Sequence, residues 1–575
     1  MSVRWWRLPA VVWLWLAAAP AAGAAELPWP RPVRIEAGLR LDELAALLER
    51  AGLGAAAELM DRARDPELIA ELGCGGADLL GCVLPGRYAP VPGLGPDAVW
   101  RALCAPFGGW FDAARRARAA ELGLDAGGLV ALAALVEREA RQPAERALIA
   151  GVLLERLRRG YHLDSPASLR HAVGLADGDF TAAPKRTAFR RELAFNTFAR
   201  RGPPPAAVCI PSRDALQALL QPAAVEQPVR FRDPQGRLRF ALEPGLAAAL
   251  QRIRPDPLPP QTTRGLHYVA SNERRQYHFR RAVERLGGVW IGVGAEQNYT
   301  MAGWARPELL ILLDFDQVVV DLHHIYRVAF AYSPDAERFL AFWHRRQRRH
   351  SAGLLRSALA ARPRLRRRAL AVFRRYRRPV AVRLRGLRDA YQQAGQPMFL
   401  TDPEQYAHLR ALVHTGRVHP LRGDLTARGS MRRLGRVLAR HGRTVRALYL
   451  SNAEQYFQYT PDFRRNVAAL PVDEWSLLLR TRPVRDDYAY VLQWYDNFLR
   501  WLRRPTVPSV RVLLPRHALS SARPLEQFVE EPFQRRRRWR RLHRVQRRGS
   551  VTDGGRPERL RGGRLQPGRQ GRTVP

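Results

Sequence analysis

The sequence predicts a multidomain protein in which an α+β first half is followed by an α/β second half. A chain of 575 residues is too long for one ordinary domain. Residues 254–263 are rich in proline and lack apolar periodicity, so we expect them to form a linker. Beyond them, short apolar segments alternate with helical ones, which is typical of a parallel α/β sheet.

The chain begins with the pattern of an export signal. Arg4 and Arg7 precede an apolar run, residues 8–25, which ends in small residues and is followed by prolines. The run spans about 18 residues, whereas a bilayer-spanning helix needs about 20. We therefore expect residues 1–25 to be either a cleaved signal peptide or a retained membrane anchor.

The net charge of +42 is carried almost wholly by arginine, because Lys185 is the only lysine. That bias indicates a GC-rich coding sequence. Residues 345–388 hold 17 arginines and no acid, and residues 533–575 hold 15 arginines and two acids. Such runs can bind nucleic acid, anionic lipid or another anionic polymer. The plainer interpretation is a solvated basic face and, at 533–575, a disordered tail, with no specific nucleic-acid partner.

Apolar spacing predicts the main elements of both halves. In the first half it favours helices, the clearest of which covers residues 127–141. In the second half, short continuous apolar runs predict buried strands. The expected elements are helices at 39–52, 127–141 and 144–159, a hairpin of 229–231 with 238–241, and strands at 289–293, 309–313, 418–421 and 445–450.

Residues 129–140 read LVALAALVEREA and place Glu137 directly after two apolar residues on a very apolar helix. An apolar setting raises the pKa of a carboxyl group and keeps it protonated near neutral pH. One such acid can protonate a glycosidic oxygen and then take the proton of the sugar's own 6-hydroxyl, which closes on the anomeric carbon. No second carboxylate is needed, unlike in most glycosidases. The alternative is a surface residue that pairs with Arg141 one turn on.

Several blocks, in order, resemble the endolytic murein transglycosylase (YceG-like) family over residues 33–240. In ALVERE, residues 134–139, Glu137 falls on the first glutamate of the family's SIVEKE. The ordered set is more specific than any one block. The other blocks are LLGCVLPGRY at 79–88, GVLLERLRRG at 151–160, FNTFARRGPPP at 195–205 and VCIPS at 208–212, which correspond to LEGYLFPDTY, VFLNRLRxG, YNTYxxxGLPP and ICNPG.

The resemblance implies a peptidoglycan lyase held by one span at the periplasmic face of the inner membrane, or secreted if the signal is cleaved. It would cut nascent glycan strands to 1,6-anhydromuramyl ends and terminate their elongation, without a cofactor and beside the cell-wall synthesis machinery. Glu137 would be the catalytic acid, while Asn196 and Thr197 would hold sugar hydroxyls or an N-acetyl group. A LysM-like subdomain, residues 33–100, would precede the catalytic domain, residues 101–253.

The chain departs from the family pattern at several polar positions. The family's QSDPT reads LDSPA at residues 163–167, so its aspartate is missing unless Asp164 substitutes from one register away and binds substrate. Glu155 and Ile210 stand where the family has asparagines. Two readings follow: a divergent active lyase, or a peptidoglycan-binding scaffold that has lost its chemistry.

Two apolar segments of the second half, residues 264–532, end in residues suited to a nucleotide. The segment GGVWIGVGAEQN contains Gly292 and Gly294, and ELLILLDFD ends in Asp314 and Asp316. In a doubly wound sheet such ends meet at the crevice where nucleotides bind, so the glycines would let the backbone approach a cofactor and the acids would bind ribose hydroxyls. The alternative is a tight strand-to-helix turn, because the full GxGxxG is absent.

Residues 268–530 also resemble an uncharacterised bacterial family with a GVGPDQNY-type block, whose sheet is similar to that of S-adenosylmethionine-dependent methyltransferases. The resemblance implies a Rossmann-like fold, with S-adenosylmethionine or another nucleotide as the cofactor of a methyltransferase-like enzyme. An exported chain would lie outside the compartment that holds this cofactor, so another ligand, or a fusion of two neighbouring genes, stays open. Fold by itself does not give chemistry.

Cysteine and histidine spacing predicts no metal site. The four cysteines form no CxxC pair, and either one disulfide or buried thiols would account for them. His323 and His324 are adjacent on an expected helix and cannot face the same way, so we expect them to pack or to lie on the surface.

Overall fold

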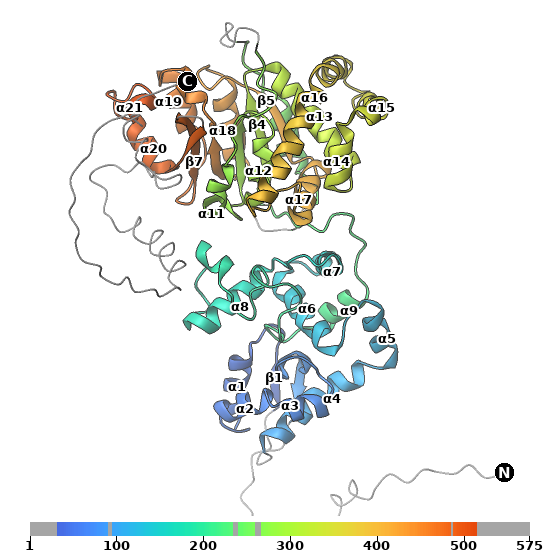
Figure 1. Ribbon diagram of the computed structural model, residues 1–575. Helices are drawn as coiled ribbons and strands as arrows, with labels where there is room; N and C mark the ends of the chain where they lie inside the picture. Colours follow the sequence, from blue (N-terminus) through green and yellow to red (C-terminus); the bar gives the residue numbers. More distant parts are fainter. Residues whose placement is uncertain are drawn as a thin grey trace, which may run out of the picture.

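The computed structural model describes residues 32–89, 95–233, 238, 240–258, 266–484 and 487–513. The chain forms a mostly helical first part, up to residue 241, and a second part, from residue 242, built around a sheet (Figure 1). The expected signal or anchor, residues 1–25, and the expected tail, residues 533–575, lie outside the described residues.

No single helix in the described ranges is long and apolar enough to cross a bilayer. Only α5 (Ala113–Glu121) and α6 (Ala126–Glu139), taken together and bent by 79°, pass that test by length and composition.

The first part begins with two short strands that enclose helices in the chain. β1 (Val33–Ile35) pairs antiparallel with β2 (Gly86–Tyr88). This unit occupies the range expected for a LysM-like subdomain, an assignment that stays a prediction. The elements between the two strands are α1 (Leu41–Arg50), α2 (Ala56–Ala63), α3 (Pro66–Glu71) and the 3-10 turn η1 (Leu80–Cys82).

Helix α6 is the central helix of the first part. Asp125 caps it, because its side chain accepts a hydrogen bond of 2.7 Å from the Gly128 amide. Residues 129–136 are all buried, so the helix is apolar around its whole circumference. The helix expected at 127–141 is present with slightly different ends. Its neighbours are η1, α5, α7 (Arg146–Arg158), α8 (Pro166–Asp177) and α9 (Arg213–Leu220).

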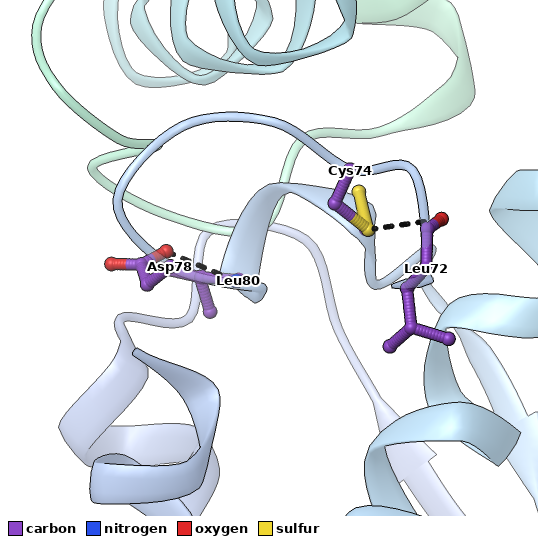
Figure 2. The surroundings of a disulfide bond; sticks show 5 residues. Leu72, Cys74, Asp78 and Leu80 are labelled. Atoms are coloured by element: carbon purple, nitrogen blue, oxygen red, sulfur yellow. Dashed lines mark hydrogen bonds between the residues drawn. A yellow bond between two sulfur atoms is a disulfide. The ribbon is translucent and has the colours of Figure 1, made fainter. Parts of the chain in front are cut away.

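A disulfide between Cys74 and Cys82 closes the loop that precedes η1 (Figure 2). Within this loop the Asp78 carboxylate accepts a hydrogen bond of 3.1 Å from the Leu80 amide, and burial raises the pKa of Asp78 to about 6. The other two cysteines, Cys104 and Cys209, are buried thiols. Both expected roles of cysteine therefore occur in one chain.

The second part contains a six-stranded sheet in the order β5-β4-β3-β6-β7-β8. Numbered by appearance within this part, the order is 3-2-1-4-5-6, that of a doubly wound sheet. All neighbours are parallel except the β7–β8 pair. The strands are β3 (Val289–Val293), β4 (Leu309–Asp314), β5 (Val418–Arg422), β6 (Val445–Tyr449), β7 (Leu477–Val484) and β8 (Asp487–Trp494).

The four strands expected from apolar runs are confirmed nearly to the residue, whereas β7 and β8 were missed. β7 contains Arg480, Arg482 and Pro483, which interrupt the apolar pattern that identified the other strands. These arginines are nevertheless buried, so charged side chains occupy interior positions of this strand.

Helices cover both faces of the sheet, and successive strand residues point to opposite layers. Trp290 belongs to one core cluster and Ile291 to the other. The Trp290 layer is formed with α12 (Gln297–Ala305), α13 (Gln317–Tyr332), α16 (Pro363–Gln393) and α17 (Pro403–His414), and the Ile291 layer with α10 (Pro244–Gln251), α18 (Ser430–Arg440), α19 (Pro461–Ala468) and α20 (Tyr495–Leu502).

The boundary between the parts differs from the one expected at 254–263. Leu246 and Leu250 of α10 are buried in the Ile291 layer, although we placed them in the catalytic range 101–253. Asp256 of the expected linker accepts a hydrogen bond of 2.9 Å from the Ser430 amide. Residues 242–258 thus belong to the second part, because their apolar stripe packs on the sheet. Of the expected hairpin, the described residues contain one bridge, Arg232 with Leu238.

The arginine-rich run forms the exposed side of α15 (Arg348–Ala358) and α16. Every third or fourth residue of α16, such as Phe373 and Leu384, is buried against the core, while arginines such as Arg374 and Arg375 face solvent. This arrangement agrees with the plainer interpretation, a solvated basic face.

Candidate active site

Glu137 lies in the last turn of α6, at the end of the buried helix but not within its apolar core. Its side chain is 14% exposed. Oε2 accepts a hydrogen bond of 2.5 Å from the Ser212 hydroxyl and one of 3.3 Å from the Ser212 amide. Ser212 also caps α9, because its hydroxyl accepts from the Ala215 amide. The carboxyl group therefore faces polar donors, which corrects the expectation of a wholly apolar setting.

Arg146, the first residue of α7, forms an ion pair with Glu137. One guanidinium nitrogen lies 3.6 Å from Glu137 Oε1, and another lies 3.6 Å from Asp214 in α9. The C-terminal end of α6 and the N-terminal ends of α7 and α9 thus converge on one carboxyl group. A positive charge beside Oε1 stabilises the carboxylate that is left after a proton is given away. Glu137 is therefore largely buried rather than a freely exposed surface residue.

The N-terminal subdomain lies next to this site. The Gly38 amide donates to the Ile210 carbonyl at 2.8 Å, and the Ile210 amide donates to the Leu39 carbonyl at 2.8 Å. These bonds tie the chain before α1 to the segment that leads into Ser212. The guanidinium of Arg40 stacks over the ring of Phe180 at 4.0 Å, so a cation–π contact joins the subdomain to the loop after α8.

His171 in α8 adds a neutral ring to this region. Its ring lies 4.7 Å from that of Phe195 and 5.7 Å from that of Phe180. Burial, and then the charge of Arg40, lowers the pKa of His171 to about 4. At neutral pH this imidazole is therefore uncharged and offers an apolar surface beside the two aromatic rings.

Asn196 and Thr197, which we expected to hold sugar groups, form hydrogen bonds inside the protein. Asn196 is fully buried, and its amide nitrogen donates to the Ala188 and Arg191 carbonyls at 3.0 and 2.8 Å. The Thr197 hydroxyl accepts a hydrogen bond of 3.1 Å from the Ser165 amide. These bonds shape the loop that follows α8. These internal partners give no support to the expected substrate-binding role of either residue, which stays a prediction.

Asp164, expected to substitute for the family's aspartate, faces the second part of the chain. Its Oδ1 lies 2.5 Å from Arg285, and its Oδ2 lies 2.6 Å from Arg156 and 3.1 Å from Arg306. The Asp164 carboxylate thus forms ion pairs with three guanidinium groups. These ion pairs give no support to its expected role as a sugar ligand, which stays a prediction.

Glu139, two residues after Glu137, is a buried carboxylate that the sequence did not single out. Ser165 donates to it at 2.5 Å, and Arg230 forms an ion pair with it. Two residues along a helix correspond to about 200°, so the two glutamates of ALVERE face nearly opposite sides. That geometry gives the two glutamates different partners, Ser212 and Arg146 for Glu137 and Ser165 and Arg230 for Glu139. Helical spacing was the available signal for separating their roles.

In the second part, Gly292 and Gly294 make room for side chains of the chain itself. A Cβ atom on Gly292 would collide with the Asn298 amide group, and one on Gly294 with that of Gln297. Gly294 also has a φ of +93°, a conformation that favours glycine. Asn298 in turn donates to the Val293 carbonyl at 3.0 Å. The tight strand-to-helix turn, the alternative reading, therefore accounts for both glycines.

Asp314 and Asp316 meet Gly294 at the carboxyl edge of the sheet, as expected, but their oxygens are engaged. Asp314 accepts from the Gly294 and Asp316 amides at 3.2 and 2.8 Å, and burial raises its pKa to about 7. Asp316 caps α13 by accepting from the Val318 amide, and its other oxygen lies 2.7 Å from His267 Nδ1.

Residues 266–275, which we call the strap, run across this edge and contact the ends of several strands. His267 binds Asp316 after β4, and the Ser271 amide donates to Glu296 after β3 at 3.0 Å. The buried Glu273 accepts from Ser451 after β6 at 2.7 Å. The strap thus lies where a doubly wound sheet would place a ligand.

The residues of this edge do not fit a nucleotide. Side chains fill the space beside both glycines, backbone amides hold Asp314, and the strap covers the strand ends. We assign no reaction step to S-adenosylmethionine or any other nucleotide here. His323, expected to pack, is buried between Tyr299 and the Gly294 carbonyl. Within the described ranges, no three or more histidine, cysteine or acidic side chains are arranged to hold a metal ion.

Comparison with known protein families assigns each half of the chain separately. Residues 19–242 match the model of the YceG-like family. Over these residues the first part of the chain is similar to that family. Residues 268–529 match the model of a domain of unknown function, DUF7790. The resemblance of the first part is thereby confirmed at the family level, whereas the likeness of the second part to methyltransferases stays a prediction.

Among solved structures, a YceG-like protein from Listeria monocytogenes matches with 16% sequence identity and a TM-score of 0.33, over 36% of this chain and 72% of that one. No curated protein matches the chain.

Proposed function

We propose that the first part is an endolytic murein transglycosylase with Glu137 as its acid and base. The observation that carries this proposal is the placement of Glu137, at the family's motif position, in a half-buried and solvent-reachable setting between α7 and α9. A catalytic carboxyl group needs both access to substrate and fixed orientation. Ser212 supplies the orientation.

The proposed reaction uses one carboxyl group twice. Glu137 donates its proton to the leaving glycosidic oxygen as the bond to the anomeric carbon breaks. Its carboxylate then accepts the proton of the 6-hydroxyl of the same sugar, whose oxygen bonds to the anomeric carbon. No water is consumed, and the product carries a 1,6-anhydro ring. Arg146, 3.6 Å from Oε1, stabilises the carboxylate between the two steps.

We further propose that the protein acts on nascent glycan strands at the periplasmic face of the inner membrane. The export pattern of residues 1–25 and the YceG-like match support this location. Glycan strands and the cell-wall synthesis machinery are the proposed partners. Cleavage within a growing strand would end its elongation.

The test is incubation of the full chain with polymeric murein, followed by mass spectrometry for 1,6-anhydromuramyl ends. Glu137→Gln keeps the shape of the side chain but cannot donate a proton, so we expect activity to fall by roughly a hundredfold or more. The matched control is Glu121→Gln, because Glu121 is 64% exposed at the end of α5. Anhydro ends made equally by the parent and by Glu137→Gln would refute the role of Glu137.

A second candidate is a peptidoglycan-binding scaffold without catalysis. The observation that motivates it is the loss of polar positions of the family pattern, such as Glu155 and Ile210 where the family has asparagines. Under this reading the parent protein would sediment with murein sacculi yet release no anhydro ends. Sedimentation and product analysis on the same sample separate the two functions.

A further inference from the structure

Four arginines stand in a row at the amino-terminal edge of the parallel sheet, opposite the strap. Arg285 precedes β3, Arg306 precedes β4, Arg417 precedes β5 and Arg443 precedes β6. Arg417 and Arg443 are almost completely buried. Adjacent parallel strands start side by side, so the residues before them share one edge. The row is therefore set by the order of the strands.

The row faces the first part of the chain. Arg417 donates to the Ala241 carbonyl at 3.2 Å and lies 4.3 Å above the ring of Phe231. Arg443 donates to the Arg232 carbonyl at 3.3 Å. Phe231 also belongs to the Trp290 core layer. The segment that ends the first part is thus bound to the amino-terminal edge of the sheet, with Phe231 buried in the core of the second part.

Arg285 and Arg306 bind the first part of the chain through ion pairs with Asp164. Arg156 of α7 joins the same group, since it lies 2.6 Å from Asp164 and 2.5 Å from Glu404. Arg306 reaches both acids as well, at 3.1 Å each. Each acid therefore binds arginines from both parts. We call these five residues the ion cluster: Asp164, Arg156, Arg285, Arg306 and Glu404.

Backbone geometry marks the ion cluster as a specific contact. Asp164, Arg285 and Arg306 have φ angles of 52°, 53° and 50°, and among the described residues only one other non-glycine residue, Ser451, has a positive φ. A left-handed backbone is unfavourable for residues other than glycine, so such conformations persist where surrounding contacts fix them. Three of these four residues meet at the Asp164 carboxylate, and one of them, Arg306, is also the left-handed C-cap of α12.

A short chain of contacts links Asp164 to the helix that carries Glu137. Ser165, the next residue, donates to Glu139 at 2.5 Å. Arg230 binds Glu139 and also the Leu163 and Asp164 carbonyls, at 3.0 and 3.1 Å. Glu139 follows Glu137 by two residues in α6. A change in the position of the Asp164 loop would therefore also move Glu139 and the last turn of α6.

We propose that the second part positions the catalytic end of the first, with Asp164, Arg285 and Arg306 as positioning residues for Glu137. This inference rests on the proposed function only for its kinetic consequence. The ion cluster holds the Asp164 loop, and the loop holds Glu139 and the last turn of α6. A DUF7790-like domain would then serve as a structural partner of the lyase rather than as a second enzyme.

The test compares full-length variants by hydrogen exchange and by kinetics. Asp164→Asn removes the negative charge of the ion cluster, and asparagine tolerates the left-handed backbone. Arg285→Ala removes one of the ion pairs that the second part forms with Asp164. The matched control is Arg368→Ala, because Arg368 binds Asp321 at 2.8 Å within the second part and away from the ion cluster. We expect amide exchange in residues 136–141 and 160–168 to accelerate by roughly tenfold in the first two variants but not in the control.

In murein cleavage, the same two variants should lower kcat by roughly tenfold to a hundredfold while KM stays near the parent value. A merely structural role would lower the folded fraction and leave kcat per folded molecule unchanged.

The exchange measurement keeps this proposal separate from the proposed function. If the parent releases no anhydro ends, the lyase proposal fails and exchange alone decides whether the parts are coupled. Exchange in both segments equal to that of the parent would overturn the coupling. Equal acceleration in Arg368→Ala would also overturn it, because general loosening of the second part would then be the cause. Should Arg285→Ala fail to fold, Asp164→Asn carries the test.

Discussion

Gly127 offers a sharp test of how α6 is held in place. It lies in the first turn of α6 and touches the loop closed by the Cys74–Cys82 disulfide. A Cβ atom at this position would lie 2.6 Å from the Gly76 nitrogen and 2.9 Å from the Gly75 carbonyl carbon. Both are backbone atoms, which cannot rotate aside as a side chain can. Gly127→Ala must therefore push the loop and the helix apart.

The expected magnitude follows from two opposing effects. Alanine is favoured over glycine within a helix by up to about 1 kcal/mol, and overpacking a tight contact costs about 1–3 kcal/mol. The contact should prevail, because the gain is small in the first turn and the loop is cross-linked. We expect the free energy of unfolding to fall by about 1–2 kcal/mol.

Gly108→Ala is the matched control for this substitution. Gly108 lies in α4 (Pro96–Trp110), and a Cβ atom there would meet nothing within 4 Å. The control should therefore gain up to about 1 kcal/mol. Urea unfolding followed by far-ultraviolet circular dichroism measures both variants against the parent. If Gly127→Ala were stabilised as much as Gly108→Ala, the close contact between α6 and the loop would be refuted.

Two further predictions concern the disulfide and a buried acid. Replacing both Cys74 and Cys82 by alanine opens a loop with a sequence separation of 8 and should lower the unfolding free energy by about 2–3 kcal/mol, measured by urea unfolding; no loss relative to Cys104→Ala would contradict it. The raised pKa of Asp314, about 7, means that its stabilising neutral form is lost as pH rises from about 4 through 7. Asp314→Asn should therefore gain stability relative to the parent over that window, by up to about 1.4 kcal/mol per pH unit, and a pH-independent difference would contradict this assignment.

The sequence located the strands of the second part because buried parallel strands are continuous apolar runs of nearly fixed length. β3, for example, occupies the expected residues 289–293. The same criterion missed β7, whose buried Arg480 lies 2.9 Å from Glu454. Polar residues in a strand are invisible to an apolar pattern when a distant partner compensates them.

The roles of polar residues could be predicted only in part. The ordered motifs singled out Glu137 as the candidate acid, which its position in ALVERE alone would not separate from the structural Glu139. They assigned Asn196 and Thr197 to substrate, although both bind carbonyls and amides of nearby loops. An amide or hydroxyl that orders a loop and one that binds a sugar look identical in sequence, because both act through the same hydrogen bonds.

The sequence by itself determined the local features of this protein: the apolar helix that ends in Glu137, the strands, and the division into two halves. Tertiary structure alone decided which groups meet. It brought Ser212 and Arg146 to Glu137, turned Asp164 toward Arg285 and Arg306, and laid the strap over the edge expected to bind a nucleotide. The physical reason is one of range. Helix and strand periodicity depends on neighbouring residues, whereas these ion pairs and hydrogen bonds join separate elements, such as Asp164 and Arg306, which lie 142 positions apart.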